Sequence, residues 1–397
     1  MLEFRQRKDK KNRQHKLGAL EMKKICYVVS IPLTIRAFFI PQLKYLSRNG
    51  FDVTVVCSPD DALAKDLGEE IRYYPIEIPR GISMKGSVDA ISSLMRFFKK
   101  EKFDIVQYST PNAALYASIA ARVAGIKVRN YHLMGFRYLG AKGIGREILK
   151  VIEIITCANS TSIECVSKSN LKLGIKEKIF PHKKATVVWN GSTGGVDLNR
   201  FDFYMREEWR KQIRKENGYQ ASDFVYGFVG RVTRDKGINE LLAAFMRLGN
   251  GSKLFVIGDM ENKDTLNQDL LNKAMKNPNI KFHESVSDIE RYYAALDVLV
   301  LPSYREGFGN VVIEAAAVGT PAVISNIPGP IDAIEEGKTA VVVETKSVKS
   351  LWNGMKEMYK ADNEKMSKKA FELARQKFDS DKLNVEILKR KSKLVQI

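Results

Sequence analysis

The sequence has few of the residues that build metal centres and disulfide frameworks. It contains four cysteines and four histidines in 397 residues, and no two cysteines form a C-x-x-C pair. The cysteines lie in or beside apolar segments, as buried reduced thiols do: Cys26, Cys57, Cys157 and Cys165. Zinc and redox functions are therefore weakly supported.

Long apolar runs are missing as well. The longest, such as "AALDVLVLP" and "ICYVVSIPL", are well short of the roughly 20 residues that a helix needs to cross a bilayer. The basic N-terminus lacks the apolar core that follows in a secretory signal. We therefore expect a cytoplasmic protein without a membrane-spanning helix.

The composition is that of a soluble globular protein, with 44% hydrophobic and 28% charged residues. The net charge of +19 is uneven. Residues 1–200 carry 34 basic and 18 acidic side chains, a net +16, and residues 201–397 carry 31 and 28, a net +3. A basic half joined to a neutral half favours contact with a polyanion, either nucleic acid or an anionic membrane. A merely soluble basic surface is the alternative.

The chain has the pattern of two doubly wound halves. Residues 1–22 show no hydrophobic period and are expected to be a basic, disordered tail, with Met22 as a second candidate for the start. From residue 23 onward apolar strands alternate with helices, which predicts an α/β fold with parallel sheets covered on both faces. The alternation breaks at "NGSTGGVDLNRFD" (190–202) and then resumes. We expect domains over 23–198 and 199–377, with the ligand bound in a cleft between them.

Two segments of the second half place polar residues directly after strands. "GRVTRDKG" (230–237) puts Arg231 and Lys236 beyond the strand that ends at Gly230. A planar arginine fork and a compact lysine charge at one strand end suit a diphosphate. Taken alone, the segment fits an ordinary solvated loop equally well.

The other segment is "REGFGNVVIE" (305–314), in which two glutamates flank a glycine-rich turn before a helix. Such a turn attracts an anion through its free N–H groups and the helix dipole, with Gly307 and Gly309 freeing the backbone and Asn310 as the expected helix cap. Glu306 and Glu314 cannot bind a phosphate, but they can accept hydrogen bonds from hydroxyl groups beside one. This spacing predicts a nucleotide-sugar site, in which one glutamate binds the sugar and the other binds the ribose.

These segments carry a family resemblance. "REGFGNVVIEAAAVGTPAV" resembles the E-x7-E motif of retaining glycosyltransferases of family 4, the glycosyl transferases group 1, which have the GT-B fold. "GRVTRDKG" resembles the phosphate-binding segment of that family. The first half, including "STPNAALYASIAARVAGIKVRNYHLMGFRYLGAKG", resembles the acceptor-side domain of bacterial capsule and O-antigen transferases. The resemblance extends over nearly all of residues 23–390.

The resemblance implies transfer of a sugar from a nucleoside-diphosphate donor, with retention of configuration and without a metal or other cofactor. The expected donor is a UDP-sugar carrying a hexose or an N-acetylhexosamine. Arg231 and Lys236 would neutralise the leaving diphosphate, Glu306 would hold the sugar and Glu314 the ribose. Negative charge growing on the leaving group is what such a site must stabilise. The donor-binding residues implied in this way are Arg231, Lys236, Glu306, Gly307, Phe308, Gly309, Asn310, Val311 and Glu314.

The acceptor side departs from the family pattern. "SIPLTIR" stands where many relatives have a glycine-rich loop after the first strand, and Met134 stands where many have a histidine or arginine. His132 and Arg137 are the remaining acceptor-side candidates, with a structural histidine as the competing interpretation of His132. The resemblance also implies that the C-terminal helix, about residues 378–397, packs back on the first domain.

The resemblance gives the basic half a partner. The implied acceptor is a polyprenyl-linked or free saccharide, and the implied location is the inner face of the cell membrane. The segment "LMRFFKKEKF" (94–103) mixes cations with Phe97, Phe98 and Phe103, as interfacial helices do. A helix with a buried aromatic face is the alternative interpretation of that segment.

Other functions remain open. A nucleotide-sugar 2-epimerase shares the fold, but it needs acid and base groups around the hexose, and no histidine–carboxylate constellation suits that role. A non-catalytic membrane-binding or nucleic-acid-binding relative is the third class. No base-stacking platform is evident, so we expect no nucleic-acid partner.

Overall fold

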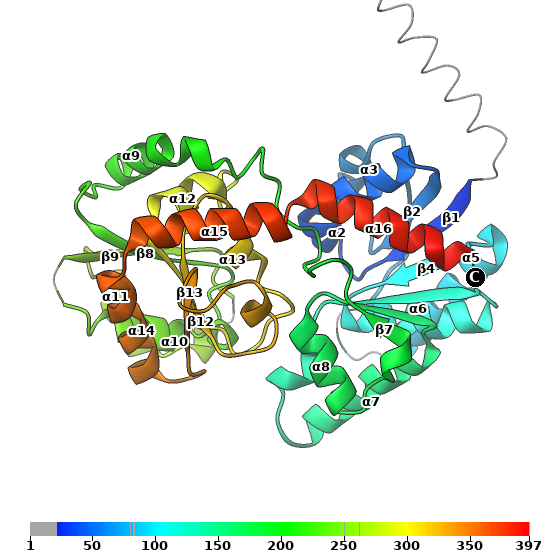
Figure 1. Ribbon diagram of the computed structural model, residues 1–397. Coiled ribbons are helices and arrows are strands. Elements are labelled where there is room, and N and C mark those ends of the chain that lie inside the picture. Colours follow the sequence, from blue (N-terminus) through cyan, green and yellow to red (C-terminus); the bar gives the residue numbers. More distant parts are fainter. Residues whose placement is uncertain (1–21, 80, 82–83, 250, 262, 397) are drawn as a thin grey trace, which may run out of the picture. The chain divides into compact units, whose positions relative to one another are not determined.

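A computed structural model describes residues 22–79, 81, 84–249, 251–261 and 263–396. The expected disordered tail falls outside these residues, apart from Met22. The chain divides into two compact units (Figure 1). The first unit consists of the chain up to His132, Ile152–Glu164, and the chain from Asn384 onward. The second unit consists of Leu133–Val151 and Cys165–Leu383.

The described part of the chain forms two sheets, and the strands within each sheet run parallel. The first sheet has the order β3-β2-β1-β4-β5-β6-β7. Its central strands are mostly buried and mostly apolar, as expected for a sheet covered on both faces. The strands are β1 (Lys23–Val28), β2 (Phe51–Cys57), β3 (Arg72–Pro75), β4 (Ile105–Tyr108), β5 (Val128–Leu133), β6 (Ser162–Cys165) and β7 (Ala185–Thr186).

Helices connect these strands. Between β1 and β2 the chain forms two short helices rather than one long helix. Proline lacks an N–H group and fits the first turn of a helix, so α3 begins just before Pro41. The connecting helices are α2 (Pro32–Phe38), α3 (Ile40–Arg48), α4 (Leu63–Leu67), α5 (Met84–Glu101), α6 (Pro111–Val123), α7 (Gly143–Asn159) and α8 (Lys168–Lys176).

The second sheet has the order β10-β9-β8-β11-β12-β13. The reversal between β9-β8 and β11 is the topological switch point at which doubly wound sheets bind ligands. The strands are β8 (Phe224–Val229), β9 (Ser252–Ile257), β10 (Ile280–His283), β11 (Val298–Leu301), β12 (Ala322–Ser325) and β13 (Ala340–Val343). The α-helices are α9 (Arg206–Glu216), α10 (Ile238–Phe245), α11 (Gln268–Met275), α12 (Ile289–Ala295), α13 (Asn310–Ala317), α14 (Val348–Lys360), α15 (Asn363–Lys377) and α16 (Ser380–Val395). The predicted α/β fold class is confirmed by the two sheets.

Several expectations about single segments are now settled. All four cysteines are buried and free, as predicted. Helix α5 has the buried aromatic face that was the alternative interpretation, because Phe97 and Phe98 lie in the core, and Phe103, just after the helix, is buried as well. No described helix combines the length and the apolar character that a bilayer crossing would require.

A buried ion pair fastens α16 to the first sheet. Lys391 of α16 and Glu164 of β6 are both almost inaccessible to water, and their side chains meet at 2.5 Å. Arg390 adds a hydrogen bond of 2.8 Å to Ser162. Removing one partner of such a pair leaves a buried charge unpaired, which costs about 3–5 kcal/mol.

A second buried carboxyl group lies on α7. Glu153 is 5% exposed, and this burial raises its pKa to about 7, although a hydrogen bond with Tyr131 lowers it. The pKa of an unfolded glutamate is about 4.3. The folded protein therefore retains a proton on Glu153 over a pH range in which the unfolded chain has lost it.

We expect the stability of the first unit to fall as the pH rises from about 4 to about 7, because the raised pKa favours the protonated folded state. The loss amounts to about 3 kcal/mol above pH 7. Glu153→Gln should remove this decline, and Glu147→Gln, at an exposed position of the same helix, should not. Urea unfolding from low to neutral pH measures the difference, and parallel curves for Glu153→Gln and the unchanged protein would contradict it.

Candidate functional site

The second sheet brings the two predicted motifs together. Strands β8 and β11 are hydrogen-bonded neighbours, with Val298 paired to Tyr226 and Leu299 to Gly227. Because both strands run in the same direction, their carboxyl ends meet at one edge. The segment with Arg231 and Lys236 follows β8, and the segment with Glu306 follows β11. Residues some 70 positions apart therefore become direct neighbours.

Two ion pairs join these segments, and each segment supplies the cation of one pair and the acid of the other. Lys236 Nζ lies 2.5 Å from Glu306 Oε1, with both side chains mostly buried, and Arg305 Nη2 lies 3.0 Å from Asp235 Oδ2. Between the pairs, the backbone N–H of Tyr304 donates to the carbonyl of Asp235 at 2.8 Å. We call this arrangement the double ion pair.

The hydrogen bonds around the double ion pair orient its carboxylates. Ser303 Oγ donates to Glu306 Oε1 at 2.8 Å, and the Thr233 hydroxyl donates to Asp235 at 2.7 Å. Burial would raise the pKa of Asp235, but the Thr233 hydroxyl and the charges of Arg305 and Lys236 hold it below its usual value. Both acids are thus fixed by their neighbours before any ligand arrives.

A glycine permits the close approach of the two segments. Gly237 has φ +74°, which favours glycine, and a Cβ there would overlap the carbonyl of Pro302. The motif "KG" thus ends with a residue that lets α10 begin directly beside the loop after β11.

Arg231 is placed differently from Lys236. Its guanidinium donates to Glu261 at 2.8 Å, and both side chains are about half exposed. Surface pairs of this kind contribute at most about 1 kcal/mol. Arg231 can therefore exchange Glu261 for an anionic ligand at little cost.

The glycine-rich turn packs against the loop that follows β5. A Cβ on Gly307 would overlap the carbonyl oxygen of Met134, and a Cβ on Gly135 would lie 2.9 Å from the Cα of Gly307. Asn170 Nδ2 also donates to the Gly307 carbonyl at 2.7 Å. Gly307 is thus required for close packing of backbone on backbone within the second unit. The two flanking apolar residues, Phe308 and Val311, are buried and partly buried.

The expected helix cap is wrong by one residue. Gly309, with φ +90°, is the N-cap of α13, and Asn310 is its first helical residue. The left-handed backbone at position 309 suits glycine, and the Asn310 side chain instead accepts from Ser192 Oγ at 3.2 Å.

Glu314 lies one turn further along α13. Its Oε2 accepts a hydrogen bond of 2.9 Å from the Tyr293 hydroxyl, and burial raises its pKa, against the lowering effects of Tyr293 and Arg200. Tyr293 fixes the direction of this carboxylate, which the sequence assigned to the ribose.

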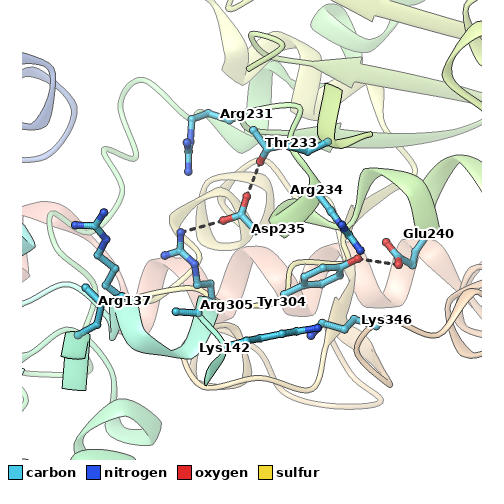
Figure 2. A pocket seen from close by; sticks show the side chains of 14 residues that line it. Arg137, Lys142, Arg231, Thr233, Arg234, Asp235, Glu240, Tyr304, Arg305 and Lys346 are labelled. Carbon is cyan, nitrogen blue, oxygen red and sulfur yellow. Dashed lines mark hydrogen bonds and ion pairs between the residues drawn. The ribbon is translucent and has the colours of Figure 1, made fainter. Parts of the chain in front are cut away.

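A cavity of about 950 Å³ opens beside the double ion pair (Figure 2). In this view the guanidinium groups of Arg137, Arg231 and Arg305 gather on one side of it. Six cationic side chains and two acidic ones line it, so its charge is strongly positive. The cations are Arg137, Lys142, Arg231, Arg234, Arg305 and Lys346, and the acids are Asp235 and Glu240.

Of these lining residues, the sequence identified Arg137 and Arg231 and missed the others. Arg234 and Arg305 were visible inside the quoted motifs, but nothing in their spacing showed that they face the same space. Lys346 lies 4.7 Å from the ring of Tyr304, a contact that only the fold creates.

His132 does not line this cavity, and it is buried in the first unit. It is 7% exposed, its ring meets Phe39 at 5.6 Å, and burial lowers its pKa to about 4. Of the two acceptor-side candidates, only Arg137 lines the cavity. Among the described residues, no group of three or more His, Cys, Asp or Glu side chains could hold a metal ion.

Two family models match the chain. The model described as "Glycosyl transferases group 1" matches residues 209–377, and the model described as "Glycosyl transferase 4-like" matches residues 24–165. The first range contains the double ion pair, both glutamates and Arg231.

Known proteins resemble the chain over most of its length. It is 31% identical over 344 residues to the capsular polysaccharide biosynthesis glycosyltransferase CapM of Staphylococcus aureus, covering 84% of this chain and 86% of that one. It is 27% identical over 347 residues to an Escherichia coli UDP-Gal:alpha-D-GlcNAc-diphosphoundecaprenol alpha-1,3-galactosyltransferase, with 84% and 87% covered. The crystal structure of Anabaena HepE in complex with UDP superposes with a TM-score of 0.75 at 18% identity, covering 94% of this chain and 100% of that one.

We expect Gly307→Ala to loosen the site, because the added methyl group must displace the Met134 carbonyl or the turn itself. Overpacking of this kind costs about 1–3 kcal/mol, and UDP binding should weaken with it. Gly145→Ala is the matched control, since a Cβ there meets nothing within 4 Å. Thermal unfolding and UDP titration of both variants measure the effect. A Gly307→Ala protein that matches Gly145→Ala in both would show that the close packing is dispensable.

Proposed function

Because the chain belongs to the family of glycosyl transferases group 1, we propose that it transfers a hexose or N-acetylhexosamine from a UDP-sugar to a lipid-linked saccharide, with retention of configuration. The product would enter a capsule, O-antigen or exopolysaccharide. The names of CapM and of the E. coli galactosyltransferase support the pathway class and the acceptor class. The UDP bound to HepE supports the nucleotide.

The observation that carries this proposal is the cationic cavity beside the double ion pair. A UDP-sugar and a diphosphate-linked acceptor bring two diphosphates to one site. We assign Arg231 and Lys236 to the donor diphosphate, and Arg137 and Lys142, from the segment between β5 and α7, to the acceptor. The amides of the turn at 307–311 add hydrogen-bond donors at the start of α13.

We assign the chemistry to a redistribution of charge around Lys236. In the structure Lys236 is neutralised by Glu306, and both Lys236 and Ser303 donate to Oε1 of that carboxylate. When a diphosphate approaches Lys236, the lysine gains a second anionic partner. Glu306 Oε2 then accepts from hydroxyl groups of the donor sugar.

As the bond between the sugar and the diphosphate breaks, negative charge grows on the leaving phosphate. Arg231 and Lys236 are positioned to stabilise that charge in place, without reorganisation of solvent. No metal is required for this role, and the leaving phosphate itself would take the acceptor's proton. Glu314 would accept from the ribose, held in direction by Tyr293.

We also propose that the enzyme works at the inner face of the membrane, docked on it rather than inserted. A lipid-linked acceptor is confined there, and the basic first half of the sequence favours anionic lipids. The 2-epimerase alternative is distinguished by the product, since an epimerase would change a free UDP-sugar in the absence of an acceptor.

Two variants separate the donor roles. Lys236→Met should weaken UDP binding by about ten- to a hundredfold, because it removes a cation from the diphosphate. Glu306→Gln should bind UDP at least as well as the unchanged protein, because it releases Lys236, yet it should lower sugar transfer by about a hundredfold or more. Calorimetric UDP titration and a radiolabelled transfer assay measure the two effects.

The controls use a surface ion pair of similar length. Lys369 and Glu372 on α15 lie 2.8 Å apart and are about half exposed, so Lys369→Met and Glu372→Gln should leave binding and transfer unchanged. Melting temperatures of all four variants show whether any loss is due to unfolding. Full transfer by a folded Glu306→Gln protein would refute the assignment of Glu306.

A further inference from the structure

Helix α7 presents an apolar face to water. Ile144, Ile148, Val151 and Ile155 follow the spacing of one helical face, and Ile154 lies beside them. Ile144 is 81% exposed, and Val151 is 54% exposed. Among the exposed residues of this helix, only Glu147 is charged. We call these five aliphatic side chains the α7 face.

The orientation of α7 is the reverse of that of an ordinary surface helix. Its buried side contains the polar residues Glu153 and Thr156, and its cations Arg146 and Lys150 point inward, over the ring of Tyr138. Lys150 also pairs with Glu177 at 2.7 Å. The polar groups face the protein while the aliphatic groups are left outside, so the α7 face needs an apolar partner.

Exposed lysines lie on the segment that contacts α7. The contact of Lys150 with Glu177 places the end of α8 against α7, and the two helices are neighbours in Figure 1. The segment 168–184 contains a single acid, Glu177. Its exposed cations, with the one that precedes α7, are Lys142, Lys168, Lys172, Lys176, Lys178 and Lys183.

We propose that the α7 face docks on an anionic lipid bilayer, with its aliphatic side chains at the boundary between headgroups and acyl chains and the neighbouring lysines on the headgroups. Charge selects this partner over a second copy of the chain. Pairing two α7 faces would bring two sets of lysines together, whereas an anionic bilayer offers both the apolar layer and the opposite charge.

The helix also joins the bilayer to the proposed active site, an extension that rests on the proposed function. Leu149 lines the cavity from α7, and Lys142 lines it from the residue before that helix. An α-helix is about 10–12 Å across with its side chains. With the α7 face on the membrane, the cavity lies one helix away from the lipid headgroups. The diphosphate and first sugars of a lipid-linked acceptor can span that distance while the lipid stays in the bilayer.

The test is flotation of the full chain with vesicles. The unchanged protein should bind vesicles of phosphatidylcholine mixed with phosphatidylglycerol, bind phosphatidylcholine alone more weakly, and lose binding as salt rises. Ile144→Gln/Ile148→Gln should reduce the partition coefficient about tenfold or more. Lys172→Gln/Lys176→Gln should reduce binding to the anionic vesicles alone.

The matched control is Met275→Gln/Val385→Gln, which removes two exposed apolar side chains from other helices and should bind vesicles like the unchanged protein. All variants should keep the melting temperature and UDP affinity. Vesicle binding that survives Ile144→Gln/Ile148→Gln would overturn the proposal. So would a dimer in sedimentation that the same variant dissociates, because the α7 face would then pair with itself.

The outcomes also separate this proposal from the proposed function. Vesicle binding through the α7 face by a protein that binds no UDP would leave docking intact and refute the transferase assignment. UDP binding by a protein that does not bind vesicles would refute docking through the α7 face and leave the transferase assignment intact.

Discussion

The double ion pair between Asp235–Lys236 and Arg305–Glu306 is the constraint on which the site depends. Each segment contributes one acid and one cation, so the double ion pair is close to neutral. Neither segment could hold its charges in this position alone. Mostly buried charges are costly unless paired, and the pairing fixes the loop after β11 against the loop after β8. The turn at Gly307 and the start of α13 follow that contact directly in the chain.

The cavity shows the opposite balance. Six cations line it against two acids, and Asp235 and Glu240 are each already bound by a neighbour, Arg305 and Tyr304. A site of this kind holds unneutralised positive charge ready for an anion, and the repulsion among the cations is relieved when the anion binds. Electrostatic preorganisation of this sort is the main device by which enzymes stabilise charged transition states. The neutral double ion pair and the charged cavity therefore complement each other, since one holds the loops in place and the other presents positive charge.

Helix α7 also has charged groups on one side and apolar groups on the other. Its inward cations contact Tyr138 and Glu177, and its outer side is aliphatic. Burial raises the pKa of its Glu153 carboxyl group to about 7. One helix thus separates a charged cavity from an apolar exterior. The aromatic-rich segment at 94–103, which drew attention in the sequence, has the same composition as an interfacial helix but turns its rings into the core.

The sequence by itself determined the two parallel α/β sheets, because apolar strands alternating with helices have few other stable solutions. It also predicts a ligand site from Arg231, Lys236 and Glu306, which follow strands, and from Glu314 in the next helix, because doubly wound sheets bind ligands beyond the ends of their strands. Only the tertiary structure decided which groups meet. Periodicity says which face of an element is buried, but it does not say which loop lies opposite. Four features depend on contacts between segments that are distant in the chain. They are the pairing of Lys236 with Glu306, the burial of His132 beneath Phe39, the gathering of Arg137, Arg234 and Arg305 around one cavity, and the exposure of an apolar face on α7 rather than on α5. The energies that select them are those of packing and charge pairing, which are properties of the folded arrangement and are not encoded in any local pattern.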